Sequence, residues 1–263
     1  MANRLNGVMS NLADNDQCGF LKGRNIATIL RTTDNVISYL SSKQLPGLQV
    51  TTDLTKAFDT ISKKLIGGSF KQYGFGPEFI QWVQTVISQN ERCVSDYRWL
   101  SKPFQVERGI RQGCPFSPML FVLAVELLAA EIRSGKIKGI TIRKKNGHEI
   151  AVMKKQTNKQ TKKQLAHDTT PHLRDKEELD EAMKIVEAFV SISGLQMPSS
   201  KTEVMWLGLN AHKIETFYNI TWVRQTKILG IYFRNNKSTC EIEDNWLAKV
   251  SSMKSIIKQW SRR

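Results

Sequence analysis

The stretch that decides the fold occupies positions 51–59 and reads Thr51-Thr52-Asp53-Leu54-Thr55-Lys56-Ala57-Phe58-Asp59. Residues 48–54 alternate like a β-strand and place Gln49, Thr51 and Asp53 on one face. An acidic residue therefore stands at the end of a predicted strand. On its own this is a weak signal, because acidic residues at strand ends are usually solvated.

A second acidic turn follows about a hundred residues later and reads Leu165-Ala166-His167-Asp168-Thr169-Thr170. Two acidic clusters at strand ends are what two-metal phosphoryl chemistry needs, because carboxylate oxygens hold two Mg²⁺ ions roughly 3.5–4 Å apart. The second cluster reads Ala-His-Asp where that chemistry calls for Ala-Asp-Asp. Whether the chain is an enzyme depends largely on His167.

The composition favours a polyanionic partner. The 263 residues carry a formal net charge of +15, with a pI near 9.7, which indicates nucleic acid or an acidic membrane face. The longest apolar run, 119–132, contains Glu126 and predicts a buried core helix, so no membrane anchor is expected. The N-terminus lacks a secretory signal. The four cysteines show no Cys-x-x-Cys spacing, which fits a reducing intracellular setting, in the nucleus or the cytoplasm.

Hydrophobic periodicity predicts an α+β domain with helices interleaved among short antiparallel strands. Helices are expected at 25–43, 77–90, 117–133, 175–193 and 242–260. In 77–90 the inward residues are Phe79, Ile80, Val83, Val86 and Ile87. Asp175 and Glu178 fit a capping-box variant, and Gly194 ends that helix. Strands are expected at 48–54, 92–98, 103–108, 203–209 and 227–233, with a hairpin formed by 137–143 and 148–153 around Asn146-Gly147.

Residues 154–163 differ from the rest of the chain. They read KKQTNKQTKK, with five lysines, no acid and no apolar residue. A solvated, disordered insert is the main interpretation. A phosphate-binding loop is the alternative.

The order of these parts resembles the reverse transcriptase domain of non-LTR (LINE-type) retrotransposons. Five segments carry the resemblance. Gln17-Cys18-Gly19-Phe20 with Gly23-Arg24 matches a fingers motif, and Asp53 to Asp59 matches the first palm motif, Asp-x-x-Lys-Ala-Phe-Asp. The long string from Arg108 to Phe121, RGIRQGCPFSPMLF, matches the second palm motif. Further matches are Ser193-Gly194-Leu195 through Lys201-Thr202-Glu203, and the primer-grip strand at Ile228-Leu229-Gly230.

The resemblance implies a palm-type polymerase fold: an antiparallel sheet with packed helices, partial fingers and the start of a thumb. The implied parts are fingers at 1–47, palm at 48–240, interrupted by the insert at 154–163, and thumb or connection helix at 241–263. The implied partners are an RNA template, a DNA primer and deoxynucleoside triphosphates, with Mg²⁺ (or Mn²⁺) as cofactor. The oligomeric state is left open.

The resemblance also implies residue roles. Asp53 and Asp168 would hold the metal ions, with the Leu54 carbonyl beside them, and Lys201 would meet the pyrophosphate leaving group. Phe58 would stack under the incoming sugar, although a plain core role is the alternative. Gln112 and Gly113 would lie along the nucleotide. Template and primer would meet Arg24, Arg111, Leu229 and Gly230; for Arg24 a surface salt bridge is the alternative.

Departures from the family pattern predict impaired catalysis. His167 stands where the family has its first metal-binding Asp, and imidazole is a poor Mg²⁺ ligand. Pro198 replaces a family Asn, and the chain looks truncated at both ends. Three hypotheses follow: a reverse transcriptase domain by descent with two-metal transfer to a primer 3′-hydroxyl, a non-catalytic nucleic-acid-binding remnant, or a decayed retroelement fragment.

Overall fold

The computed structural model describes residues 1–15, 17–88, 91–142, 162–165, 168–215, 220–235 and 240–260. Within these elements, the side chains at 53, 162–165, 168–169, 240–243, 256–257 and 259–260 are not among those described. The described residues form a mixed α+β structure around a five-stranded sheet with the order β6-β7-β1-β8-β9.

Strand β1 (Pro46–Asp53) lies at the centre of the sheet. It is antiparallel to β7 (Asp168–Leu173) on one side and to β8 (Glu203–Gly208) on the other. Strand β6 (Lys162–Leu165) pairs antiparallel with β7, and β9 (Thr221–Trp222) pairs parallel with β8. The predicted strand at 48–54 is therefore confirmed, and Pro46 begins it, at the position where a missing N–H is tolerated.

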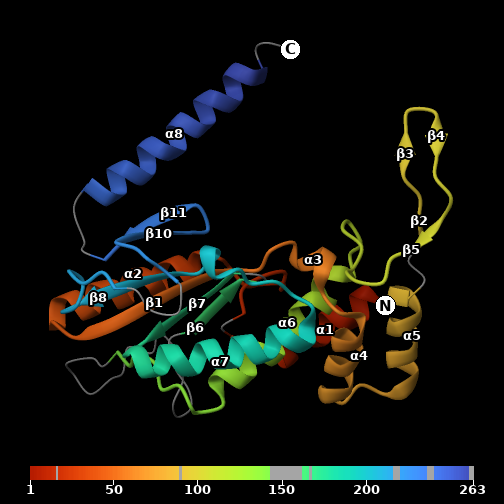
Figure 1. The fold of residues 1–263 in the computed structure, drawn as a ribbon, viewed down its shortest axis with the longest axis horizontal. Coiled ribbons are helices and arrows are strands. Elements are labelled where there is room, and N and C mark those ends of the chain that lie inside the picture. Colours follow the sequence, from red (N-terminus) through yellow and green to blue (C-terminus); the bar gives the residue numbers. More distant parts are fainter. Residues whose placement is uncertain are drawn as a thin grey trace.

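One face of the sheet is covered by α6 (Ser117–Arg133) and α7 (Lys176–Ser193), as Figure 1 shows. Leu48 and Val50 of β1 enter a common core with these helices. Twelve of the 17 residues of α6 are buried, because the helix is largely apolar and lies between the sheet, α1 (Ala2–Leu12) and α4 (Lys63–Gln72). The boundaries predicted for α6 are confirmed.

The opposite face carries α2 (Ala27–Lys43) and a hairpin of β10 (Gln225–Ile228) and β11 (Ile231–Arg234). Together they enclose a second core with the outward residues of β8. Gly47 marks the close approach of α2, since a Cβ there would lie 2.6 Å from Leu40 Cδ1. A side chain at Gly47 would force the ends of the Leu40 and Ile140 side chains to shift.

The remaining elements surround this sandwich. Helices α3 (Ala57–Thr60), α4 and α5 (Pro77–Ser88) follow β1. A narrow ribbon of β2 (Glu91–Arg92), β3 (Ser95–Asp96), β4 (Trp99–Leu100) and β5 (Phe104–Gln105) projects from the end of α5, and α8 (Cys240–Trp260) extends away from the sheet (Figure 1). The short helix η1 (Ser199–Lys201) precedes β8. Among the described residues, no helix is both long and apolar enough to cross a membrane.

Helix α1 is held to α6 by charged groups. Glu126, on α6, accepts a hydrogen bond from the backbone N–H of Asp14 (3.2 Å) and forms an ion pair with Arg133. Arg133 Nε also lies 3.8 Å from Asp14 Oδ2. Because Glu126 is buried, these partners are what allow a carboxylate at this position.

The prediction of a single strand at 227–233 was wrong, because these residues form part of a hairpin. Leu229 and Gly230 have φ values of 50° and 84°, and Ile228 pairs with Ile231 across them. Two consecutive residues with positive φ form the type I′ turn, whose twist suits a two-residue hairpin loop. The runs at 92–98 and 103–108 likewise form only two-residue strands, which pair as β2 with β5 and β3 with β4.

The first arm of the hairpin expected at 137–143 is also corrected. Residues 137–142 form no strand, because the backbone N–H groups of Lys138 and Gly139 donate to the Glu178 carboxylate rather than to a partner strand. The other arm, at 148–153, lies outside the described residues.

Two smaller expectations change as well. Val86 is 47% exposed, since the buried stripe of α5 consists of Ile80, Val83 and Ile87. The lysine-rich segment was placed at 154–163, but Lys162 and Lys163 belong to β6, where their backbone pairs with that of Pro171 and Thr170 of β7. Residues 154–161 lie outside the described residues.

Candidate active site

The two acidic positions singled out in the sequence are brought together by the sheet. Asp53, the last residue of β1, is directly opposite Asp168, the first residue of β7. Residues opposite each other in an antiparallel pair have Cα atoms about 4.5–5.5 Å apart and belong to the same face. Asp168 in turn pairs with Leu165 of β6, so the end of β6 and the start of β7 lie beside the end of β1. Ala166 and His167 lie outside the described set.

The backbone beyond Asp53 turns sharply toward α3. Leu54 is buried in the core, and Thr55 donates its N–H to the carbonyl of Gln196 (2.9 Å). Lys56 then adopts a left-handed conformation (φ 48°) ahead of α3. The Thr55–Gln196 hydrogen bond joins the chain just after β1 to the segment that leads to η1. Lys201, the last residue of η1, is exposed.

Phe58, on α3, is half-buried between two other rings. It stacks on Phe121 of α6 with ring centroids 4.9 Å apart, and meets Phe20 edge-on at 6.1 Å. Phe20 comes from the fingers motif and Phe121 from the second palm motif. Three motifs that are distant in the sequence therefore meet at one aromatic cluster.

The segment that carries Gln112 is docked on the backbone of α3. Gly109 N–H donates to the carbonyl of Ile61 and Ile110 N–H to that of Phe58, both at 2.8 Å. Gln112 Nε2 then lies 3.4 Å from Asp59 Oδ1. Gln112 and Phe58, both predicted to contact a nucleotide, are thus held on neighbouring segments by backbone hydrogen bonds.

The glycines of this segment differ in a testable way. Both Gly109 and Gly113 have positive φ (81° and 80°), but a Cβ on Gly109 would lie 2.6 Å from the carbonyl oxygen of Asp59, whereas a Cβ on Gly113 would meet nothing within 4 Å. Positive φ costs an L-residue about 1–2 kcal/mol, and a forced clash adds about 1–3 kcal/mol. We expect Gly109→Ala to lower the free energy of unfolding by about 2 kcal/mol more than Gly113→Ala.

Urea unfolding of the two variants beside the native chain measures this difference. Gly113→Ala is the matched control, because it carries the same backbone strain without the contact. Equal losses in the two variants would contradict the docking of 109–112 on α3.

Arg24 does not point to an acidic partner. Its guanidinium donates to the backbone carbonyls of Gln17 (2.7 Å), Ala13 (2.9 Å) and Ser10 (3.2 Å), and also to that of Asp14. These carbonyls lie at and beyond the C-terminal end of α1, where a helix favours cations. These contacts give Arg24 a role in stabilising the fold. The sequence had suggested a template contact or a surface salt bridge, and neither interpretation included this role.

The β10–β11 hairpin lies over the face of the sheet that carries Thr51 and Glu203. Thr226 Oγ1 is 2.6 Å from Glu203 Oε2 and 3.3 Å from Thr51 Oγ1, and Thr51 pairs with Glu203 across β1 and β8. Leu229 and Gly230 form the turn of this hairpin. Glu203 is an acidic residue that sequence reasoning left without a role. Strand alternation within β8 is the signal that would have placed it on this face.

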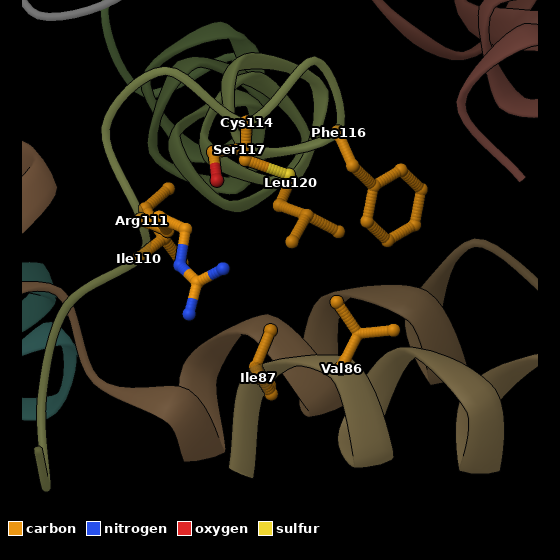
Figure 2. Close-up of a pocket in the computed structure, with 8 residues that line it drawn as sticks. All are labelled: Val86, Ile87, Ile110, Arg111, Cys114, Phe116, Ser117 and Leu120. Carbon is orange, nitrogen blue, oxygen red and sulfur yellow. The ribbon is translucent and has the colours of Figure 1, made fainter. Parts of the chain in front are cut away.

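A cavity of about 130 Å³ lies beside the Gln112 segment, between α5 and the start of α6 (Figure 2). Val86 and Ile87 enter it from α5, and Arg111 and Cys114 from the opposite wall. Burial by itself raises the pKa of the Cys114 thiol. The backbone N–H groups of Phe116 and Ser117, the Ser117 hydroxyl and the Arg111 guanidinium outweigh it, so this pKa lies below its ordinary value.

Cys114 should accordingly react at lower pH than an ordinary thiol. The thiolate is the nucleophile, so alkylation by iodoacetamide should reach half its maximal rate below about pH 8.5, the value for an unperturbed thiol. Arg111→Gln should move that midpoint upward, because it removes the cation that favours the thiolate. Peptide mass spectrometry over a pH series measures both, with exposed Cys93 as an internal comparison. An unchanged midpoint in Arg111→Gln would contradict the contribution of Arg111.

Among the residues whose side chains are described, no group of three or more His, Cys, Asp or Glu side chains gathers as a metal site. Asp53 and Asp168 are outside that set. The structural observation that bears on metal binding is therefore the backbone pairing of Asp53 with Asp168.

The central antiparallel strands, the β6–β7 hairpin that adjoins the end of β1, and the helices packed below them define the palm of a polymerase. Solved structures with this fold include a telomerase from Candida albicans in complex with a fragment of telomeric RNA (TM-score 0.58, 10% identity) and the corresponding Candida tropicalis complex (TM-score 0.57, 12% identity). The first match covers 89% of this chain and 36% of the telomerase, the second 90% and 36%. At such low identity the likeness concerns the fold.

Residues 1–233 match the family described as reverse transcriptase (RNA-dependent DNA polymerase), and the chain belongs to that family. The Xenopus laevis transposon TX1 uncharacterized 149 kDa protein is 25% identical over 99% of this chain. The Pol polyprotein of the type-2 retrotransposable element R2DM of Drosophila melanogaster is 30% identical over 51%. The predicted resemblance to non-LTR retrotransposon proteins is confirmed. The matched regions span 20% and 12% of these relatives.

Proposed function

We propose that this chain is the palm region of an RNA-directed DNA polymerase whose nucleotidyl transfer is impaired by His167, and which retains primer–template binding. The observation that carries the proposal is the register of Asp53 opposite Asp168. Family membership supports the reaction class, and the replacement at His167 supports the impairment. The proposed partners are an RNA template, a DNA primer and deoxynucleoside triphosphates.

The proposed cofactor is Mg²⁺, with Mn²⁺ as a substitute. Carboxylate and carbonyl oxygens are the hard donors that Mg²⁺ takes, so Asp53, Asp168 and the Leu54 carbonyl fit as a donor set. When bound, two such ions would activate the primer 3′-hydroxyl and offset the charge of the transferring phosphoryl group. A neutral imidazole at 167 supplies neither a hard oxygen donor nor a negative charge.

The remaining residues are proposed to position the substrates. Phe58 would support the incoming sugar, while Gln112 and Gly113 would lie along the nucleotide. Lys201 would stand near the pyrophosphate. Template and primer would pass Arg111 and the Leu229-Gly230 turn, with Arg24 holding the fingers segment in place rather than touching the template.

The domain division proposed from this arrangement keeps the boundaries expected from the sequence. Residues 1–47 are partial fingers, 48–240 the palm and 241–263 the start of the thumb. The α8 helix extends away from the sheet (Figure 1), which supports assigning residues 241–263 to the start of the thumb.

A second candidate, nucleic-acid binding without catalysis, is favoured by the net charge of +15. Phosphate-driven binding weakens steeply with salt, because each neutralised phosphate releases counterions. We expect filter binding of a primer–template to lose about 10³-fold or more in affinity between low and physiological salt. Affinity that does not change with salt would overturn phosphate-driven binding in both candidates.

A further inference from the structure

The ribbon formed by residues 91–105, called here the arm, carries an unusual set of exposed aromatic side chains. Tyr97 is fully exposed (101%), Trp99 is 82% exposed and Phe104 47%. Val94 and Leu100 add exposed apolar surface at 59% and 70%. Figure 1 shows the arm, in yellow, standing clear of the body of the molecule. Apolar surface gathered in this way on an exposed element marks an interaction site.

The arm is built to hold its rings outward. Ser101 N–H donates to the carbonyl of Val94 (2.9 Å), and Val94 N–H donates to the Ser101 hydroxyl (2.8 Å). Asp96 pairs with Trp99 across the tip, and Gln105 Nε2 donates to Glu91 at the base (2.8 Å). A two-stranded ribbon is marginally stable by itself, and these cross-strand bonds contribute to holding its two strands together.

The tip also carries backbone strain at an aromatic residue. Tyr97 has a φ of 49°, in the left-handed region that favours glycine. A bulky residue in this region is an outlier that persists where it serves a purpose. Glycine would fit this turn with less strain, so the exposed ring of Tyr97 stands at a position whose backbone disfavours it.

The charges of the arm indicate which partner fits. Arg98 lies between Tyr97 and Trp99 in the sequence. The other charged residues of the arm are Arg92, Lys102, Glu91 and Asp96, so three positive charges stand beside two negative ones. Aromatic side chains and arginine are common at protein-docking surfaces too, but this chain carries a net charge of +15 and belongs to a polymerase family. In that setting an aromatic-cation-aromatic tip matches bases that stack and a phosphate between them. Because positive charges only slightly outnumber negative charges in the arm, stacking rather than charge supplies most of the binding free energy at this site.

The arm is also continuous with the candidate active site. Within a few residues of Gln105 the chain reaches Gly109 and Ile110, whose N–H groups dock on α3, and then Gln112. The root is held by Lys63, whose ammonium group donates to the carbonyl of Val106. A strand held at the tip of the arm is therefore connected to the nucleotide-positioning segment by a short, tethered piece of backbone.

From these observations we infer that the arm is a stacking platform for unpaired bases of single-stranded nucleic acid. This goes beyond the proposed function, on which it rests only in taking nucleic acid as the ligand. It requires neither metal nor nucleotide. Tyr97 and Trp99 supply the stacking faces and Arg98 contacts the phosphate between them.

The test compares two labelled strands of equal length, oligo(dA) and the same backbone without bases, with metal and nucleotide omitted. The native chain should bind oligo(dA) about tenfold or more tightly than the abasic strand, since each stacked base contributes strongly. The double variant Tyr97→Gly/Trp99→Thr should lose most of that ratio and keep its salt dependence. Glycine relieves the strain at 97 and threonine suits a strand, so this variant keeps the ribbon. Oligo(rA) run in parallel distinguishes RNA from DNA as the preferred strand.

Trp82→Gln is the matched control, because Trp82 is an exposed tryptophan (50%) on α5, outside the arm. It should retain the full ratio. If the double variant still prefers oligo(dA) to the abasic strand as strongly as the native chain does, the inference is overturned, while the proposed function stays in place. Native chain that binds neither strand overturns both. Concentration-dependent self-association that the double variant abolishes, with no change in the ratio, would assign the arm to a second copy of the chain instead.

Discussion

Replacing Glu178 with alanine should lower the free energy of unfolding by about 4 kcal/mol, the largest loss expected from a side chain outside the candidate active site. The Glu178 carboxylate is buried and accepts the backbone N–H groups of Lys138 (2.9 Å), Gly139 (3.1 Å) and Arg174 (3.0 Å). It also accepts from Arg174 Nε at 2.8 Å. Alanine leaves these donors without an acceptor, and each unsatisfied buried group costs about 1–3 kcal/mol.

Urea unfolding measures the loss, and two variants control it. Glu177→Ala removes an exposed acid from the same first turn of α7 and should change stability by less than about 0.5 kcal/mol. Glu178→Gln keeps an acceptor oxygen and should lose less than Glu178→Ala. Equal effects of Glu177→Ala and Glu178→Ala would contradict the role of Glu178 as the junction of α7 with 138–139.

The helices of this fold could be predicted from the sequence because their signals are local. The run from Ser117 to Arg133 is bounded by a Gly/Pro-rich turn, and Asp175 and Gly194 mark the ends of α7 by capping. Asp175 accepts the N–H of Glu178 (2.9 Å), and Gly194 has the left-handed φ of 71°. Only half of the expected capping box formed, because the Glu178 carboxylate is occupied by amides about forty residues earlier.

The features that escaped prediction depend on contacts between distant segments or on short turns. The Leu229-Gly230 turn lacks the Asn-Gly signal, so a hairpin looked like one strand. The strands of the arm are too short to show periodicity. In the candidate site, the motifs predicted which residues matter, and the β1–β7 register then placed Asp53 opposite Asp168. The contacts of Arg24 with α1 and of Thr226 with Glu203 arise only from tertiary packing.

The second large effect is expected at His167. Metal clamping contributes several kcal/mol to lowering the barrier for phosphoryl transfer, and each 1.36 kcal/mol changes the rate tenfold. If the rest of the palm is intact, His167→Asp should raise the rate of nucleotide incorporation about 10²–10⁴-fold. The restored activity should depend on Asp53, because Asp53 pairs with Asp168, the residue next to position 167, and all three positions belong to the proposed metal site. His167→Asn, which matches aspartate in shape without its charge, is the control and should restore little.

The most direct test of the account is primer extension on an RNA template with Mg²⁺, carried out on the native chain, His167→Asp, and His167→Asp combined with Asp53→Ala. We expect slow or undetectable extension by the native chain, a gain of about 10²–10⁴-fold in His167→Asp, and loss of that gain in the double variant. Robust extension by the native chain that disappears in Asp53→Ala alone would contradict it, because the palm would then be catalytic with histidine at position 167.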